Sequence, residues 1–258
     1  MHYSNGLEYI IRNSYNPNSY NISYLFREQN DDYKSKKHSQ FIETELYGSS
    51  ASRISYSNKN VYMAYIPTHS FMPEFFLNSL RPKTRITQNN NEARIIAEEI
   101  FINMMGEKLP SNISISILPL DEFKELHSLF GQWNNGILGF SINGKTKNIF
   151  VRENHFDELI LVIGHEIGHV LNDTLPNIHD EEAKAFAFSI EWAKTIKEKN
   201  IGHLGLNIKD EFNFQPAKNG LHDVAFEFVN LMINMGKKAI ELHNDLVKKY
   251  VSVFNILY

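Results

Sequence analysis

A short motif near the middle of the chain combines residue types that bind metal ions and transfer protons. His165 and His169 stand four positions apart, and Glu166 follows the first of them. Residues four apart share one face of an α-helix, so both imidazoles can direct a nitrogen at one ion. A carboxylate in the place of Glu166 can reach a water on that ion and accept its proton as a general base. We therefore expect a zinc-dependent hydrolase, with Zn2+ bound by His165 and His169 and with Glu166 as the catalytic residue.

The surroundings of the motif favour a metal site over a chance match. The run from Leu159 to Leu171 is almost wholly apolar apart from the two histidines and the glutamate. Burying these polar side chains without partners would be costly, and a metal ion would supply a partner. The chain has no cysteine, which excludes a disulfide framework and a thiolate zinc site. Histidine and carboxylate side chains are therefore the ligand types that remain.

A catalytic zinc site needs a third protein ligand, because it usually takes three and leaves a fourth position open. The extended metzincin pattern would place a histidine at position 175, which is Leu175, so that pattern is excluded. The segment that follows opens with Asp180, Glu181 and Glu182. We therefore expect a carboxylate from the start of the next helix.

Helical spacing ranks these acidic residues. Glu182 lies four positions before Phe186 on the apolar face of the predicted helix, so it is the preferred ligand. Asp180 stands nearer the helix end, where capping is the default role, and it is the main alternative. Glu181 is expected to point away from the apolar face, and His179 is a weaker candidate.

The segments before the motif predict elements that could position it. Apolar residues at helical spacing predict a helix over 91–105 that begins in an asparagine run and stops at Gly106. Alternation of isoleucine and serine predicts a strand over 113–117. A short helix over 121–130 is expected next. Asn143 and Gly144 then predict a turn between two strands, 137–142 and 147–151, that form a β-hairpin.

The motif itself is predicted to lie on a helix that Asn154 or Asp157 caps and that runs to about residue 172. A further helix is expected from near Asp180, with an apolar face. This order of elements predicts the α+β class and a compact unit over about 91–199.

The two flanks differ from this unit. Ten of the twelve tyrosines fall within the first 65 residues, among many Asn and Ser, so residues 1–90 are expected to form an irregular or β-containing accessory segment. Residues 200–258 are expected to form a C-terminal helical extension. Apolar residues from Leu221 to Phe254 recur every three or four positions, which predicts one long helix or two helices hinged near Gly236 that pack on the core.

Four stretches together resemble the minimal gluzincin core of the ImmA/IrrE-type metallopeptidases, over about residues 91–199. They are Gly139-Phe140-Ser141-Ile142, Asn148-Ile149-Phe150-Val151, His165-Glu166-Ile167-Gly168-His169 and 180–187 (Asp-Glu-Glu-Ala-Lys-Ala-Phe-Ala). The resemblance implies a minimal zincin core, a small mixed sheet packed on the HExxH helix, with a glutamate ligand from a later helix. Strict register with the family places Asp180 at that ligand position, whereas the Glu-Glu pair after Leu-Pro points to Glu182.

The resemblance also implies that an extended peptide would bind by main-chain hydrogen bonds along an exposed edge strand, Ile149–Val151. The expected function is therefore a zinc metallopeptidase that hydrolyses a peptide bond in a protein substrate. An exported effector or toxin protease is one alternative, and a zinc-binding regulatory module without proteolysis is another. No single residue is indicated for stabilising the oxyanion, although His155 and His203 are candidates.

Composition narrows the remaining function classes. The net charge of -4 gives no general reason to expect a nucleic-acid partner. The longest apolar run is too short to span a bilayer, and the N-terminus has no charged-then-apolar signal pattern. These features predict a cytoplasmic protein, or one exported without a recognisable signal peptide, and they do not predict an oligomeric state.

Overall fold

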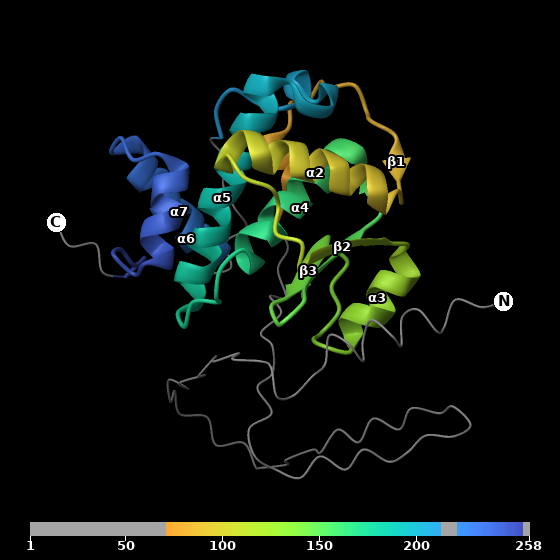
Figure 1. The fold of residues 1–258 in the computed structure, drawn as a ribbon, viewed down its shortest axis with the longest axis horizontal. Coiled ribbons are helices and arrows are strands. Elements are labelled where there is room, and N and C mark those ends of the chain that lie inside the picture. Colours follow the sequence, from red (N-terminus) through yellow and green to blue (C-terminus); the bar gives the residue numbers. More distant parts are fainter. Residues whose placement is uncertain (1–70, 213–220, 255–258) are drawn as a thin grey trace, which may run out of the picture.

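The computed structural model describes residues 71–212 and 221–254 and has the α+β architecture shown in Figure 1. Residues 1–70, most of the expected accessory segment, lie outside the described residues. The described α-helices are α2 (Asn90–Met105), α3 (Leu120–Ser128), α4 (Phe156–Val170), α5 (Ile178–Lys199), α6 (His222–Asn234) and α7 (Ala239–Val247). The strands are β1 (Ile86–Thr87), β2 (Ile113–Leu118), β3 (Gly139–Ile142), β4 (Lys147–Arg152) and β5 (Asn154–His155). Three 3-10 helices complete the set: η1 (Pro73–Phe76), η2 (Ile201–His203) and η3 (Gly205–Asn207).

A mixed three-stranded sheet lies between α3 and the helical part of the molecule. Its strand order is β2-β4-β3, with β2 parallel and β3 antiparallel to β4. Successive side chains of a strand point to opposite faces. Ile149 and Val151 of β4 accordingly join the main core, whereas Phe150 joins a smaller apolar cluster beneath α3. The predicted strand, short helix and hairpin are thus confirmed in order and type.

The expectation that Ile149–Val151 forms an exposed edge is wrong. β4 is the central strand, and all three residues are buried. Consecutive apolar residues favour the central position in a sheet, because both faces of a central strand are covered there. Among the described strands, β3 is the edge that lies next to α4.

Helices α4 and α5 pack closely along the centre of the molecule. A Cβ atom on Gly164 would lie 2.5 Å from the Trp192 ring, and one on Gly168 would lie 2.9 Å from the Cα atom of Ala185. These two glycines therefore permit the close approach of the two helices. Trp192 Nε1 also donates a hydrogen bond to the carbonyl of Ile160, at 3.1 Å.

The expected start and end of α2 are confirmed, whereas the expected caps of α4 and α5 are wrong. Asn89 caps α2, and Gly106 ends it with a φ of 77°. At α4, His155 occupies the N-cap position without a side-chain cap bond, so neither Asn154 nor Asp157 is the cap. At α5, the cap is Asn177, whose side chain accepts from two backbone amides of the first turn. Asp180 therefore does not carry the cap, because an asparagine three positions earlier already supplies it.

The C-terminal segment forms two helices, and the predicted hinge at Gly236, with a φ of 95°, separates them. Both α6 and α7 pack against α5 (Figure 1). Some of the apolar residues between Leu221 and Phe254 do not pack on the core as expected, because Met235, Tyr250 and Phe254 are exposed. Within the two described ranges, no helix combines the length and apolar character needed to cross a membrane.

Candidate metal centre

Three side chains from α4 and α5 converge between the two helices. One ligand atom each of His165, His169 and Glu182 lies within 4.8 Å of the other two. The Nε2 atoms of His165 and His169 are 3.3 Å apart. Glu182 Oε2 lies 3.7 Å from the first and 3.8 Å from the second. The four-residue spacing on α4 and the start of α5 thus bring the expected ligand residues together.

Hydrogen bonds at the far side of each imidazole fix its orientation. His169 Nδ1 lies 2.9 Å from Glu181 Oε1, a carboxylate that can only accept when ionised. His165 Nδ1 lies 3.1 Å from Ser189 Oγ, whose own proton goes to the carbonyl of Ala185. Both Nδ1 atoms therefore carry a proton, which leaves the two Nε2 atoms facing each other with room for either a proton or a metal ion between them.

The donor set fits a metal ion on two further observations. Glu182 Oε2 is buried, and its polar neighbours are the Nε2 atoms of His165, His169 and His222, at 3.3 to 3.8 Å and outside good hydrogen-bond geometry, although such atoms in folded proteins are nearly always satisfied. Tetrahedral zinc, with nitrogen ligands at about 2.0 to 2.1 Å, places two such nitrogens about 3.3 to 3.4 Å apart. The observed separation of the two Nε2 atoms agrees with this spacing.

The balance of buried charge also favours a cation. Glu166, Glu181 and Glu182 are all buried, and Lys184 is a buried ammonium group beside them. When no metal ion is bound, a proton on His169 offsets part of this negative charge. A divalent cation in the place of that proton would offset more of it, and buried charge is costly when it is not compensated.

The titration of the two histidines follows from the same charges. Burial lowers the pKa of His169, but the carboxylates of Glu182 and Glu181 more than reverse this and raise it to about 9. Burial and the charge on His169 hold the pKa of His165 well below its usual value. Burial raises the pKa of Glu182, but His222 and His169 outweigh it, so that pKa lies well below its usual range. A proton on His169 therefore occupies the place where a cation would bind.

Glu166 lies between this cluster and the edge strand. Its side chain is buried, and burial raises its pKa to about 7, against the opposing effects of His169 and of a hydrogen bond with Ser141. A Cβ atom on Gly139 would lie 3.1 Å from Glu166 Oε1 and 2.5 Å from Val162 Cγ1. Glycine at this position therefore lets β3 approach the carboxylate closely. A group with a pKa near neutrality can both accept and release a proton.

The expectation that Glu181 points away is wrong. Its carboxylate is buried and accepts from His169 Nδ1, from the backbone amide of Leu175 at 2.7 Å and from Lys184 Nζ at 2.8 Å. The segment between α4 and α5 folds against the first turn of α5, so two adjacent positions of that turn are both enclosed. Asp180, the alternative ligand, instead accepts from the end of the described chain, Ser252 Oγ and the amide of Val253.

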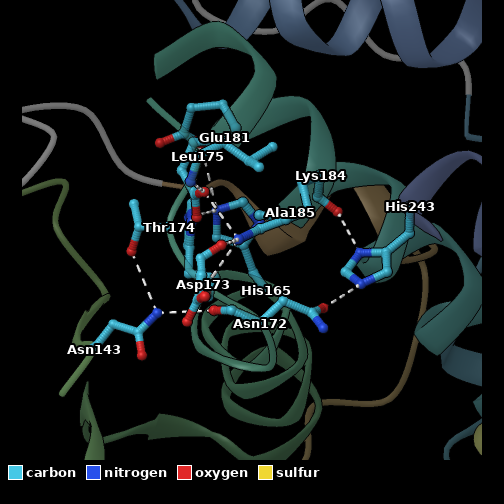
Figure 2. Close-up of polar contacts among 12 residues, drawn as sticks. Asn143, His165, Asn172, Asp173, Thr174, Leu175, Glu181, Lys184, Ala185 and His243 are labelled. Carbon is cyan, nitrogen blue, oxygen red and sulfur yellow. Dashed lines mark hydrogen bonds and ion pairs between the residues drawn. The ribbon is translucent and has the colours of Figure 1, made fainter. Parts of the chain in front are cut away.

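Further polar contacts hold the segment after α4 in place (Figure 2). Lys184 Nζ donates to the carbonyl of His169 at 3.1 Å. Asn143, in the hairpin turn, donates to the carbonyl of Asn172 at 2.8 Å. His243 of α7 lies 3.1 Å from both the Lys184 carbonyl and the Asn172 side chain. The hairpin and α7 thus brace the segment that encloses Glu181.

The histidines considered for the oxyanion lie elsewhere. His155 precedes α4, about 15 Å along the helix from His165 at 1.5 Å per residue, and its ring contacts the carbonyl of Thr84. His203 lies beyond the opposite end of α5 from Glu182. His179, the weaker ligand candidate, packs edge-on against the ring of Phe254.

Sequence reasoning missed a histidine that does reach the cluster. The Nε2 atom of His222, the first residue of α6, lies 3.3 Å from Glu182 Oε2. A single histidine at the start of an apolar helix has no local signature, and only the packing of α6 on α5 reveals it.

Comparison of the chain with known proteins adds no assignment, because no protein-family model, curated protein or solved structure matches it significantly.

Proposed function

We propose that this protein is a zinc-dependent peptidase with a gluzincin-type centre, in which His165, His169 and Glu182 hold the ion. One observation carries the proposal: the Nε2 atoms of His165 and His169, 3.3 Å apart, and the buried carboxylate of Glu182 lie together between α4 and α5, close enough to bind one ion. Two imidazoles and one carboxylate are the protein ligands of several catalytic zinc sites, whose fourth position remains open. Zinc is favoured over harder cations because imidazole nitrogens supply two of the three ligands.

The chemistry divides between the ion and the side chains around it. Bound zinc supplies a Lewis acid that lowers the pKa of water and polarises a carbonyl group. Glu166 accepts the proton of the attacking water and delivers it to the leaving amine. Glu181 and Ser189 hold the two imidazoles in the tautomer that leaves Nε2 available.

The edge strand β3 is the proposed binding site for an extended peptide. The amide of Arg152 donates to the carbonyl of Leu138, so Leu138 directs its backbone groups towards β4. Antiparallel pairing alternates, and Gly139 and Ser141 therefore direct their N–H and C=O groups away from β4. An extended substrate can pair with these groups. Such pairing would bring a peptide bond close to Glu166, because Gly139 lies directly against that carboxylate.

The test is peptide cleavage by the zinc-loaded protein and by its Glu166→Gln variant. The wild type should cleave members of a broad peptide library. The variant should bind zinc equally well and lose cleavage by several orders of magnitude, because an amide oxygen does not accept the proton. Glu158→Gln, near the other end of α4, is the matched control and should retain activity.

Equal cleavage by the wild type and Glu166→Gln would exclude the hydrolytic mechanism. Zinc binding without any cleavage by the wild type would instead favour a regulatory module that uses the same metal centre.

A further inference from the structure

The contact between His222 and Glu182 joins the C-terminal helices to the metal centre. His222 is buried, and its Nε2 atom faces Glu182 Oε2, the oxygen that points towards the two histidine ligands. Its ring also meets that of Phe186 edge-on, with centroids 5.9 Å apart. The imidazole is therefore enclosed beside a ligand carboxylate.

The docking of α6 on α5 holds His222 in this place. Phe226, one turn after His222, packs edge-on against Phe186 with ring centroids 5.4 Å apart. Ala225 and Val229 on the same helix are fully buried. Because residues four apart share a helix face, the packing of Phe226 also fixes the direction of His222. A surface histidine would lack this restraint.

Each of the other two ligands already has a residue that orients it. Glu181 holds His169, and Ser189 holds His165. Partners of this kind fix the direction of a ligand and tune its strength, and their loss typically costs about 10- to 100-fold in metal affinity. Glu182 needs such a partner too, because a carboxylate can rotate its two oxygens away from an ion.

We propose that His222 is a positioning residue of the metal centre, which holds the Glu182 carboxylate in its metal-binding orientation and thereby makes α6 part of the site. This inference rests on the metal centre proposed above. Metal affinity then depends on the docking of a helix that supplies no metal ligand.

The experiment measures the affinity of the full-length metal-free protein for Zn2+, by competition with a chromophoric chelator, and records the visible spectrum of its Co2+ form. His222→Leu should bind Zn2+ about 10- to 100-fold more weakly. His222→Gln should recover most of the affinity, because its amide nitrogen can stand near the place of Nε2. The side chain in His222→Asn is polar but too short to reach Glu182. This variant replaces the leucine variant if the latter does not fold, and it should show the same loss of affinity.

His127→Leu is the matched control. His127 is another fully buried histidine, but it packs against Trp133 and Phe140 in the smaller apolar cluster. This variant should bind Zn2+ as the wild type does. Circular dichroism should show that every variant compared is folded.

Wild-type affinity in folded His222→Leu or His222→Asn would overturn the proposal and leave His222 a packing residue. A glutamine variant as weak as the leucine variant, with a Co2+ spectrum that reports a lost nitrogen donor, would overturn it differently, because His222 would then be a ligand. Failure of the wild type to bind Zn2+ would contradict the metal centre itself, which separates the two claims.

Discussion

At the residue scale, two adjacent glutamates at the start of α5 have different partners. Glu182 directs Oε2 towards the imidazoles of His165, His169 and His222, whereas Glu181 accepts from His169 Nδ1 on the other side of that ring. Asp180, the next residue back, contacts the end of the described chain instead. Three consecutive acidic residues thus receive three separate roles from their direction alone.

This division predicts an order of metal affinities. Glu182→Ala should weaken zinc binding most, because it removes a direct ligand. Glu181→Ala should weaken it by about 10- to 100-fold, because it releases His169 without removing a ligand. Asp180→Ala should leave zinc affinity unchanged and only loosen residues 252 and 253. Competition titrations on the three variants would check the order, and the greatest loss in Asp180→Ala would return the ligand role to that residue.

Sequence spacing was informative for residues on one helix and weak across helices. The four-residue interval anticipated that His165 and His169 would meet, and the apolar face of α5 indicated Glu182. The same reasoning misplaced Glu181, because a helical wheel assumes one buried face and the first turn of α5 is enclosed on two sides. His222 lies 40 positions beyond Glu182, so no local pattern relates the two.

At the element scale, the close approach of β3 to α4 depends on Gly139. An alanine there would place its Cβ atom 2.5 Å from Val162 Cγ1 and 3.1 Å from Glu166 Oε1. Gly139→Ala should therefore displace the edge strand, cost about 1 to 3 kcal/mol of stability as an overpacked site does, and lower cleavage. Thermal unfolding and cleavage assays would measure the two effects.

Gly106→Ala provides the comparison for that variant. Its φ of 77° is strained for alanine, but no atom lies within 4 Å of the added Cβ. It should cost about 1 kcal/mol of stability without changing cleavage. If the two variants lost activity equally, the position of β3 would not matter for the reaction.

The start of α4 is anchored by Asp157 rather than capped by it. The buried carboxylate accepts from Arg81 at 2.7 Å, Thr84 at 2.8 Å and Asn207 at 2.9 Å. Burial alone would raise the pKa of Asp157, but these hydrogen bonds and the arginine charge lower it. The pKa of Asp157 in the folded state therefore lies below its pKa in the unfolded state, which is near 4. The ionised carboxylate stabilises the fold above about pH 4, and this stability is lost as the pH falls through the folded-state pKa.

Asp157→Asn should therefore destabilise the fold by about 1 to 3 kcal/mol at neutral pH, because the amide presents a donor where only acceptors fit. The difference from the wild type should shrink below about pH 4, where the wild-type carboxylate also becomes protonated. Denaturant unfolding at pH 7 and pH 3 would measure it. A difference that is independent of pH would contradict the role of the ionised carboxylate.

Strand order was the part of the fold that local patterns did not predict. Alternation and the Asn-Gly turn identified β2 and the hairpin, but the parallel pairing of β2 with β4 joins residues 34 positions apart, such as Ile113 and Lys147. That pairing moves β4 from the edge to the centre and leaves β3 beside Glu166. The apolar run Ile149-Phe150-Val151 is the one local sign of it, since edge strands rarely bury both faces.

At the scale of the whole molecule, the metal centre connects parts that are distant in sequence. The hairpin turn and α7 brace the segment after α4, and α6 brings His222 to Glu182 (Figure 2 shows the contacts of Asn143 and His243). An ion that binds only the folded arrangement stabilises all of it, by about 2.7 kcal/mol at a free concentration one hundred times Kd.

Chelation of the metal should therefore lower the melting temperature of the wild type by about 5 to 10 °C. His165→Ala should melt at the same temperature with and without chelator, because it has lost the ion already. Differential scanning calorimetry would measure both. A chelator effect of equal size in the variant would mean that the stabilising ion binds elsewhere.

The most direct test of the metal centre is a crystal structure of the zinc-loaded wild type, with anomalous scattering recorded on both sides of the zinc absorption edge. We expect one strong peak per chain between α4 and α5, with His165 Nε2 and His169 Nε2 at about 2.0 to 2.1 Å and Glu182 Oε2 at about 2.0 to 2.2 Å. We also expect an open coordination position that faces Glu166 and β3. A zinc peak held by other residues, or the absence of a peak between these two helices in zinc-saturated crystals, would contradict the account.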